Sequence, residues 1–99
     1  MEITSNKNGD TLFISPKGRL DTASAPQLDE VLKTSVDGVK ELILDLSDLE
    51  YMSSAGLRIL LSAQKTMLKQ GKMTVKNVND TIMEIFEITG FKDILNIEN

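Results

Sequence analysis

The sequence predicts a single α/β domain whose mixed, mostly parallel sheet has four to five strands flanked by helices. Short apolar segments alternate with longer amphipathic ones, which is typical of strands joined through helices by right-handed crossovers. The length of 99 residues suits one domain with one core, and no linker, repeat or low-complexity segment interrupts it. We therefore expect one domain over residues 1–99, with the element order β-β-α-β-α-β-α-β.

The chain is expected to begin with a β-hairpin. Residues 11–16 have an apolar strand pattern, residues 8–10 read Asn-Gly-Asp, which is a turn signal, and residues 2–5 can supply the other arm. Because Pro16 has no N–H to donate to a ladder, we expect an edge or irregular position there. The hairpin would give the sheet an antiparallel edge.

A first helix is expected to start near Ala23 or Ser24. Ser24 and Gln27 have capping-box spacing, and Gly38 suits a left-handed C-terminal cap. The apolar residues between them recur at helical intervals. They are Leu28, Val31, Leu32 and Val36.

Residues 41–46 are apolar on both faces, as expected for a central parallel strand. Residues 47–50 then form a polar link with one anchoring leucine, and a second helix is predicted from about Ser54 to Lys69. Its buried side is expected to comprise Leu57, Leu60, Leu61, Gln64, Met67 and Leu68. Its polar stripe is expected to comprise Arg58, Ser62, Lys65 and Lys69.

The last third of the chain predicts one more strand–helix unit. Residues 73–78 read as a strand of alternating character, and Asn79 or Asp80 can cap a third helix that stops at Gly90. Residues 91–97 are expected to form a turn and a short last strand. One side of the third helix is expected to carry Ile82, Ile85, Phe86 and Thr89.

Composition excludes several classes of chemistry. There is no Cys and no His, which rules out disulfides and thiolate or imidazole metal sites. The sequence also lacks the glycine-rich phosphate-binding motifs and the Gly-x-Ser-x-Gly nucleophile elbow. We therefore expect neither an enzyme nor a bound metal or cofactor.

Charge and hydropathy narrow the expected partners and the expected cellular location. The net charge of −4 and the scattered basic residues argue against a nucleic-acid binder. No apolar run approaches the ~20 residues that span a bilayer, and the first residues lack the apolar core of a signal peptide. A cytoplasmic protein without membrane contact is expected.

Two serines, Ser53 and Ser54, lie where the buried strand gives way to the second helix. Serine is a preferred N-cap, because its hydroxyl accepts from a free backbone N–H. If Ser53 caps, Ser54 takes the first helical position with a free hydroxyl. A phosphate there would add about −1.5 to −2 charges at the positive end of the helix dipole, where Arg58 could pair with it.

The chain resembles the STAS family, the bacterial anti-sigma-factor antagonists and their relatives, over nearly its full length. Three segments carry the likeness: residues 18–21 (Gly-Arg-Leu-Asp), residues 42–57, which contain Tyr-Met-Ser-Ser-Ala-Gly-Leu, and residues 85–91. The resemblance implies that the unphosphorylated protein binds an anti-sigma factor that is also a serine kinase, which frees the sigma factor. The kinase then phosphorylates a serine at the start of the second helix and blocks binding, and a serine phosphatase restores the active form.

Carried onto this chain, the resemblance places the phosphate acceptor at Ser54. The family motif commonly reads Asp-Ser-Ser/Ala-Gly-Leu, so Ser53 stands where an Asp is usual and becomes a competing acceptor. Loops at the carboxyl ends of the strands gather on one edge, and the partner-binding surface is expected there. It comprises Asp21, Thr22, Ser24, Ser53, Ser54, Arg58 and Ser62.

A second hypothesis keeps the family but removes the switch. The chain would be a fixed STAS interaction subunit in a transporter-associated or signalling assembly, without a kinase. The replacement of Asp by Ser53 favours this alternative slightly.

Overall fold

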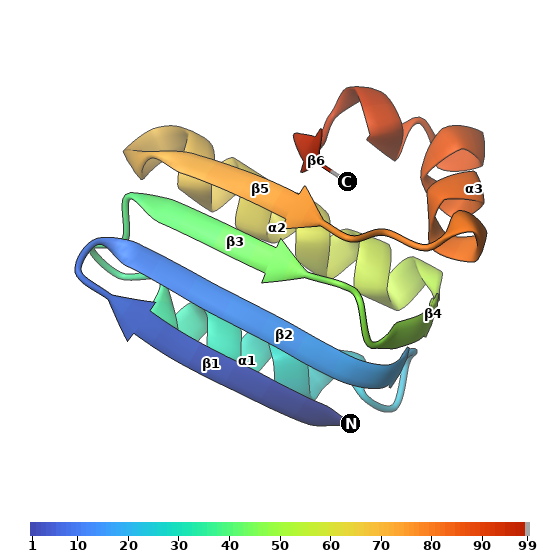
Figure 1. The fold of residues 1–99 in the computed structure, drawn as a ribbon, viewed down its shortest axis with the longest axis horizontal. Coiled ribbons are helices and arrows are strands. Elements are labelled where there is room, and N and C mark those ends of the chain that lie inside the picture. The colour runs from blue at the N-terminus through green and yellow to red at the C-terminus, as the bar shows by residue number, and fades with distance from the viewer. Residues whose placement is uncertain (99) are drawn as a thin grey trace.

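The computed structural model describes residues 1–98 of the chain (Figure 1). Its first half consists of β1 (Glu2–Asn8), β2 (Thr11–Leu20), α1 (Ala25–Ser35), β3 (Glu41–Asp45) and β4 (Leu49–Met52). Its second half consists of α2 (Ser54–Gln70), β5 (Lys72–Lys76), α3 (Asp80–Thr89), the 3-10 helix η1 (Phe91–Asp93) and β6 (Ile97–Glu98). The predicted α/β class is confirmed.

The strands form one mixed sheet in the order β1-β2-β3-β5-β6, and β4 pairs with β2 outside this path. β1 is antiparallel to β2, and the other pairs are parallel, as predicted. The described residues give six strands, one more than expected, because the segment predicted as a polar link contains β4. Its two buried side chains, Leu49 and Met52, are three residues apart, so the sequence lacks the alternation that indicates a strand.

Strand β2 changes partners along its length. It pairs with β3 through Thr11–Ile14 and with β4 through Gly18–Leu20, with a register shift after Gly18. Pro16 lies between these two segments, opposite Ile3 of β1, so its missing N–H breaks neither parallel ladder. At Pro16 the other side of β2 has no partner strand among the described residues, so the predicted edge position is confirmed, whereas the register irregularity lies after Gly18.

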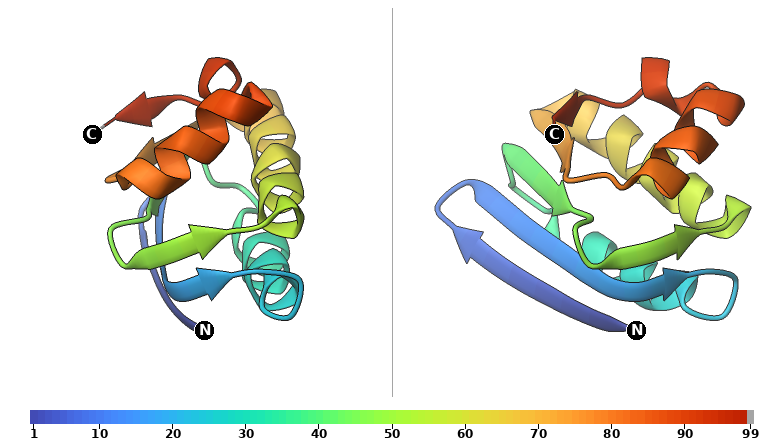
Figure 2. Two further views of the ribbon diagram at one scale, coloured as in Figure 1. Left: turned by 90° about the vertical axis from the view of Figure 1, so that its right-hand side faces the viewer. Right: turned by 45° about the vertical axis from the view of Figure 1, so that its right-hand side comes forward.

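Helices α1 and α2 cover one face of the sheet, and α3 packs at the end near β4 (Figures 1 and 2). The core lies between the sheet and these helices, and its largest side chains are at most 1% exposed. They include Leu12, Ile14, Leu28, Leu42, Leu44, Leu60, Met67 and Phe86. The β2–α1 loop and the β4–α2 junction leave this core at the same end of the sheet (Figure 2).

The ends of α3 follow the local signals in the sequence. Asn79 is the N-cap, and its Oδ1 accepts a hydrogen bond from the backbone N–H of Ile82 at 2.9 Å. Gly90 ends the helix with a φ of 81°, a left-handed conformation that glycine adopts without strain. Both predictions are confirmed.

Two burial predictions were wrong. Leu68 is 69% exposed. The buried side of α2 is centred on Leu60 and Met67, and Leu68 lies at its flank. Burial does not alternate along strand β5, because Thr74 is only 3% exposed and both of its neighbours are buried as well. Asn96 explains this burial, because its side-chain amide donates to the Thr74 hydroxyl at 3.2 Å.

Candidate partner-binding site

Strand β4 brings the two loops of the candidate site together. In the β2–β4 ladder, Leu20 lies opposite Met52, and the backbone N–H of Ser53 donates to the carbonyl of Leu20 at 2.8 Å. The chain therefore enters α2 directly beside the point where β2 leaves for α1. The first residue of the β2–α1 loop, Asp21, thus follows the residue that holds Ser53 in place.

Gly56 allows the first turn of α2 to lie directly on these strand ends. A Cβ built at Gly56 would be 2.7 Å from Leu20 Cδ2 and 2.8 Å from Met52 Cγ, closer than real Cβ contacts. Leu20 is 0% and Met52 1% exposed, so neither has free space into which to turn. The glycine of the Ser-Ala-Gly-Leu segment is therefore a packing requirement that fixes the helix start against the sheet.

Ser53 occupies the N-cap position but does not cap through its hydroxyl. Its backbone is extended, with φ −90° and ψ 177°, and its carbonyl accepts from the N–H of Leu57 at 3.1 Å. The Oγ atom is buried and has no hydrogen-bond partner among residues 1–98. The predicted position was correct, but the predicted hydroxyl bond was wrong, because the side-chain oxygen lies inside the protein rather than over the free N–H groups.

Ser54 is the first residue of α2 and is exposed, as predicted. In the described part of the chain its hydroxyl makes no hydrogen bond. The first N–H groups of a helix have no intrahelical partner and carry the positive end of the dipole. An exposed hydroxyl at this end is a position where an added anion is electrostatically favoured.

The β2–α1 loop is organised by Asp21, not by the predicted capping box. Its Oδ1 accepts from the N–H groups of Ala23 and Ser24, both at 3.1 Å. Ser24 has a helical backbone, and its hydroxyl donates back to the carbonyl of Arg19 at 2.7 Å. The N–H of Gln27 donates to the backbone carbonyl of Ser24 at 3.0 Å and not to its hydroxyl. The capping-box prediction was therefore wrong.

The same contacts set the ionisation of Asp21. The bond from the Ser24 N–H lowers its pKa most, and partial burial opposes this effect. The Ser24 hydroxyl, the Ala23 N–H and the charge of Arg19 lower the pKa further. Asp21 thus holds its loop as a carboxylate, while Thr22 between these partners is exposed.

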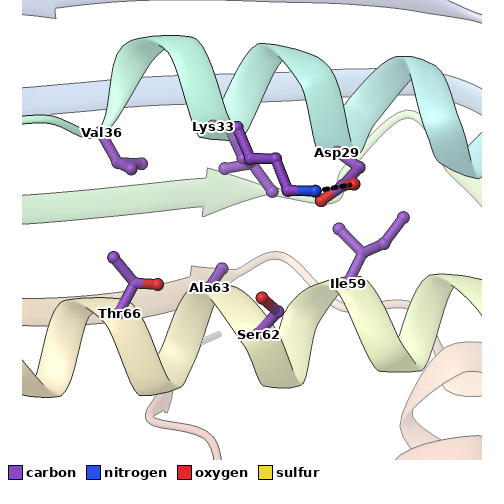
Figure 3. Close-up of a pocket in the computed structure, with 8 residues that line it drawn as sticks. Asp29, Lys33, Val36, Ile59, Ser62, Ala63 and Thr66 are labelled. Carbon is purple, nitrogen blue, oxygen red and sulfur yellow. Dashed lines mark ion pairs between the residues drawn. The ribbon is translucent and has the colours of Figure 1, made fainter.

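Arg58 and Ser62 follow Ser54 at successive turns of α2, and both are exposed. Across the part that the structure describes, the guanidinium of Arg58 has no ion pair or hydrogen bond. Ser62 borders a small groove of about 30 Å³ between α1 and α2, which also has Ile59 and Val36 in its lining (Figure 3). The structure thus places all seven predicted site residues on the two loops and on the exposed side of α2.

One contact at this edge was not predicted. The guanidinium carbon of Arg19 lies 4.6 Å from the ring centroid of Tyr51, a cation–π distance. The two residues face each other in the β2–β4 ladder. Their pairing depends on β4, so no local signal in the sequence could have revealed it.

The acidic residue nearest the end of β3, Asp45, has a structural role. Its Oδ1 accepts from the N–H of Ser47 at 3.0 Å and from the side-chain amide of Asn77 at 3.1 Å. Burial raises its pKa, but these bonds and the charge of Lys76 outweigh burial, so the net pKa is lowered. Within residues 1–98, no group of three or more acidic side chains could hold a metal ion.

Comparison with known proteins gives one family. Residues 2–99 match the STAS domain family. The anti-sigma-B factor antagonist of Bacillus subtilis is 31% identical over 98 residues, which cover 98% of this chain and 90% of that protein.

No helix in the described part of the chain is long and apolar enough to cross a membrane.

Solved structures agree on the fold. Unphosphorylated SpoIIAA, an anti-sigma factor antagonist, matches with a TM-score of 0.78 at 18% identity, covering 99% of this chain and 88% of that one. The phosphorylated form of SpoIIAA, a Bacillus cell fate determinant, matches with a TM-score of 0.77 at 19% identity, covering 99% and 92%. These relatives are regulatory binding proteins and not enzymes. The chain belongs to the STAS domain family, in the group of the anti-sigma factor antagonists.

Proposed function

We propose that this protein is a cytoplasmic, phosphorylation-switched anti-sigma factor antagonist. In its unphosphorylated form it binds an anti-sigma factor that is also a serine kinase, and so releases the sigma factor. Phosphorylation of Ser54 by that kinase ends binding, and a serine phosphatase restores it. The observation that carries this proposal is the exposed hydroxyl of Ser54 at the first position of α2.

Burial separates the two candidate acceptors. The Oγ of Ser53 is buried, and its backbone is held at both ends, by Leu20 and by Leu57. A kinase must bring the acceptor oxygen into line with the γ-phosphate, which requires an accessible hydroxyl. Ser54 meets this requirement without any rearrangement, whereas Ser53 would first have to leave its site.

A phosphate on Ser54 would change the surface without refolding the domain. It would add about −1.5 to −2 charges at the helix N-terminus, where an anion is tolerated. Arg58 lies one turn further along α2, at the spacing that suits an ion pair.

The partner would contact the edge where the two loops meet and the adjoining face of α2. Gly56 and the Ser53–Leu20 bond hold this edge rigid, which limits the entropy lost on binding. The proposed contact residues are Asp21, Thr22, Ser24, Ser53, Ser54, Arg58 and Ser62.

The test combines kinase mapping with binding. The purified protein is incubated with its cognate anti-sigma factor and ATP, and the phosphate is located by mass spectrometry. We expect phosphate on Ser54 in the wild type and in Ser53→Ala, and none in Ser54→Ala. We also expect Ser54→Asp to weaken binding of the anti-sigma factor at least tenfold, with Ser54→Ala as the matched control. Phosphate on neither serine, with binding unaffected by Ser54→Asp, would refute the proposal.

One observation keeps a second function open. Ser53 replaces the usual acidic neighbour of the acceptor, and its hydroxyl does not cap the helix. A fixed interaction subunit of a transporter-associated or signalling assembly needs no kinase recognition at this point. Purification of the native complex separates the two: a constant permease or transport ATPase supports this function, and a serine kinase supports the first.

A further inference from the structure

Charge is strongly segregated between the helices. Helix α2 contains three basic residues and no acidic one, in a chain whose net charge is −4. Helix α3 has the opposite bias, with three acidic residues and no basic one. The helix that begins at Ser54 is thus a cationic element on an acidic protein.

The three cations of α2 form one exposed line, which we call the cationic ridge: Arg58, Lys65 and Lys69. At ~100° per residue, they fall with Ser54 and Ser62 within an arc of about 80°. All five residues are exposed. The ridge runs for about 16 Å from Arg58 to Lys69 at 1.5 Å per residue, and it starts one turn after Ser54.

None of these cations is neutralised within the described part of the chain. The ion pair that the structure shows there joins Lys33 to Asp29 at 2.9 Å, within α1. No carboxylate of the described residues offsets these charges, so the ridge carries a positive potential beside the proposed phosphorylation site.

The flank of the ridge is apolar. Leu68, between Lys65 and Lys69 in sequence, is 69% exposed, and Ile94 is 45% exposed. The carbonyl of Ile94 accepts from the side-chain amide of Gln64, which holds this segment against α2. Exposed apolar side chains beside charges favour a protein partner over a nucleic acid. An anionic membrane is disfavoured because the main apolar side of α2 is already buried in the core.

We propose that the cationic ridge docks an acidic surface of the anti-sigma factor. This inference rests on the proposed function and extends its interface beyond Ser62 to Lys65 and Lys69. It also gives the switch an electrostatic mechanism. A phosphate on Ser54 places negative charge at the Arg58 end of the ridge and pairs with Arg58. The acidic partner surface is then repelled by the phosphate, where Arg58 attracted it before.

The test measures the rate of association between the unphosphorylated protein and the purified anti-sigma factor at 50 and 400 mM NaCl. Rim charges act mainly on the association rate and on its salt dependence. We expect the wild-type rate to fall at least tenfold at the higher salt. The K65E/K69E variant should associate at least tenfold more slowly at 50 mM NaCl and should lose most of the salt dependence.

The matched control is K7E/K17E, which changes the net charge equally at two exposed lysines of β1 and β2, outside α2. Its association rate should stay within twofold of wild type. Thermal unfolding of both variants checks that the fold is retained.

The outcomes separate the two proposals. If the anti-sigma factor binds the wild type and phosphorylation blocks it, but K65E/K69E behaves like the control, the ridge inference is wrong and the proposed function stands. If the wild type does not bind the anti-sigma factor, both fall. If the wild type sediments with phosphatidylglycerol vesicles and K65E/K69E does not, the ridge is a membrane surface and the inference is overturned.

Discussion

Replacing Gly56 by alanine tests how tightly α2 is seated on the sheet. The new methyl group would lie 2.7 Å from Leu20 Cδ2, 2.8 Å from Leu20 Cγ and 2.8 Å from Met52 Cγ. Carbon atoms in optimal contact are about 3.5–4.0 Å apart, so the helix start or both side chains must move by about 1 Å. Overpacking of this kind costs about 1–3 kcal/mol.

Helix propensity opposes part of this cost. Alanine is about 1 kcal/mol more favourable than glycine inside a helix. The free energy of unfolding should therefore fall by up to about 2 kcal/mol, with about 1 kcal/mol as the central value. For a domain of this size, 1 kcal/mol corresponds to about 4–8 °C in Tm. Urea unfolding and thermal unfolding followed by circular dichroism both measure it.

A pair of substitutions at Lys65 measures the propensity term within the same helix. Lys65 is exposed, so the stability difference between Lys65→Ala and Lys65→Gly reports propensity without a packing contribution. If Gly56→Ala were stabilising by the same amount as this difference, the methyl group would meet no resistance. The close packing of α2 on Leu20 and Met52 would then be refuted.

Three further substitutions test other parts of the structure. Gly71→Ala should destabilise the domain more than Gly56→Ala does in urea unfolding, because its Cβ would clash with the backbone carbonyl of Lys40, which cannot rotate away; equal stability to wild type would contradict this. Asn79→Ala should lower the free energy of unfolding by at least about 1 kcal/mol, since the N–H of Ile82 loses its acceptor and the carbonyl of Leu49 loses its donor, whereas Asn79→Asp should recover only the cap, because a carboxylate cannot donate to the Leu49 carbonyl. Asp21→Asn should lower Tm at neutral pH. The pKa of Asp21 is lowered by folding, so its stabilisation is present above its ordinary value of 3.8 and is lost as the pH falls below that value through the folded pKa. The Tm difference between wild type and Asp21→Asn should therefore shrink in acid, and a difference that grew in acid would show that the pKa is raised.

Features with a local cause could be predicted from the sequence. The cap at Asn79 and the stop at Gly90 each depend on one residue and its neighbours, and both are confirmed. The central strand β3 was recognised because burial on both faces leaves a continuous apolar run. The exposed position of Ser54 followed from placing the helix start correctly.

Features that depend on contacts between residues far apart in the chain could not be predicted from the sequence. Strand β4 exists because β2 offers it an edge, and Leu49 and Met52 carry no strand pattern of their own. The direction of the Ser53 and Ser24 hydroxyls was equally hidden, because each serine satisfied a local capping rule that the tertiary structure overrides. For the same reason, the sequence could show that two serines meet a helix and that Ser54 is exposed, but not that the hydroxyl of Ser53 is buried.

The pairing of β4 gives the proposed binding edge a stability of its own. Along residues 1–98, this four-residue strand is joined to the sheet only through β2, and the β2–β3–β5 ladders do not pass through it. Opening β4 exposes Leu49 and Met52 and breaks its packing against α3, but it leaves the central ladders closed, so it costs less than global unfolding. Substitutions at this edge can therefore change partner specificity while the central β2–β3–β5 ladders keep the domain folded.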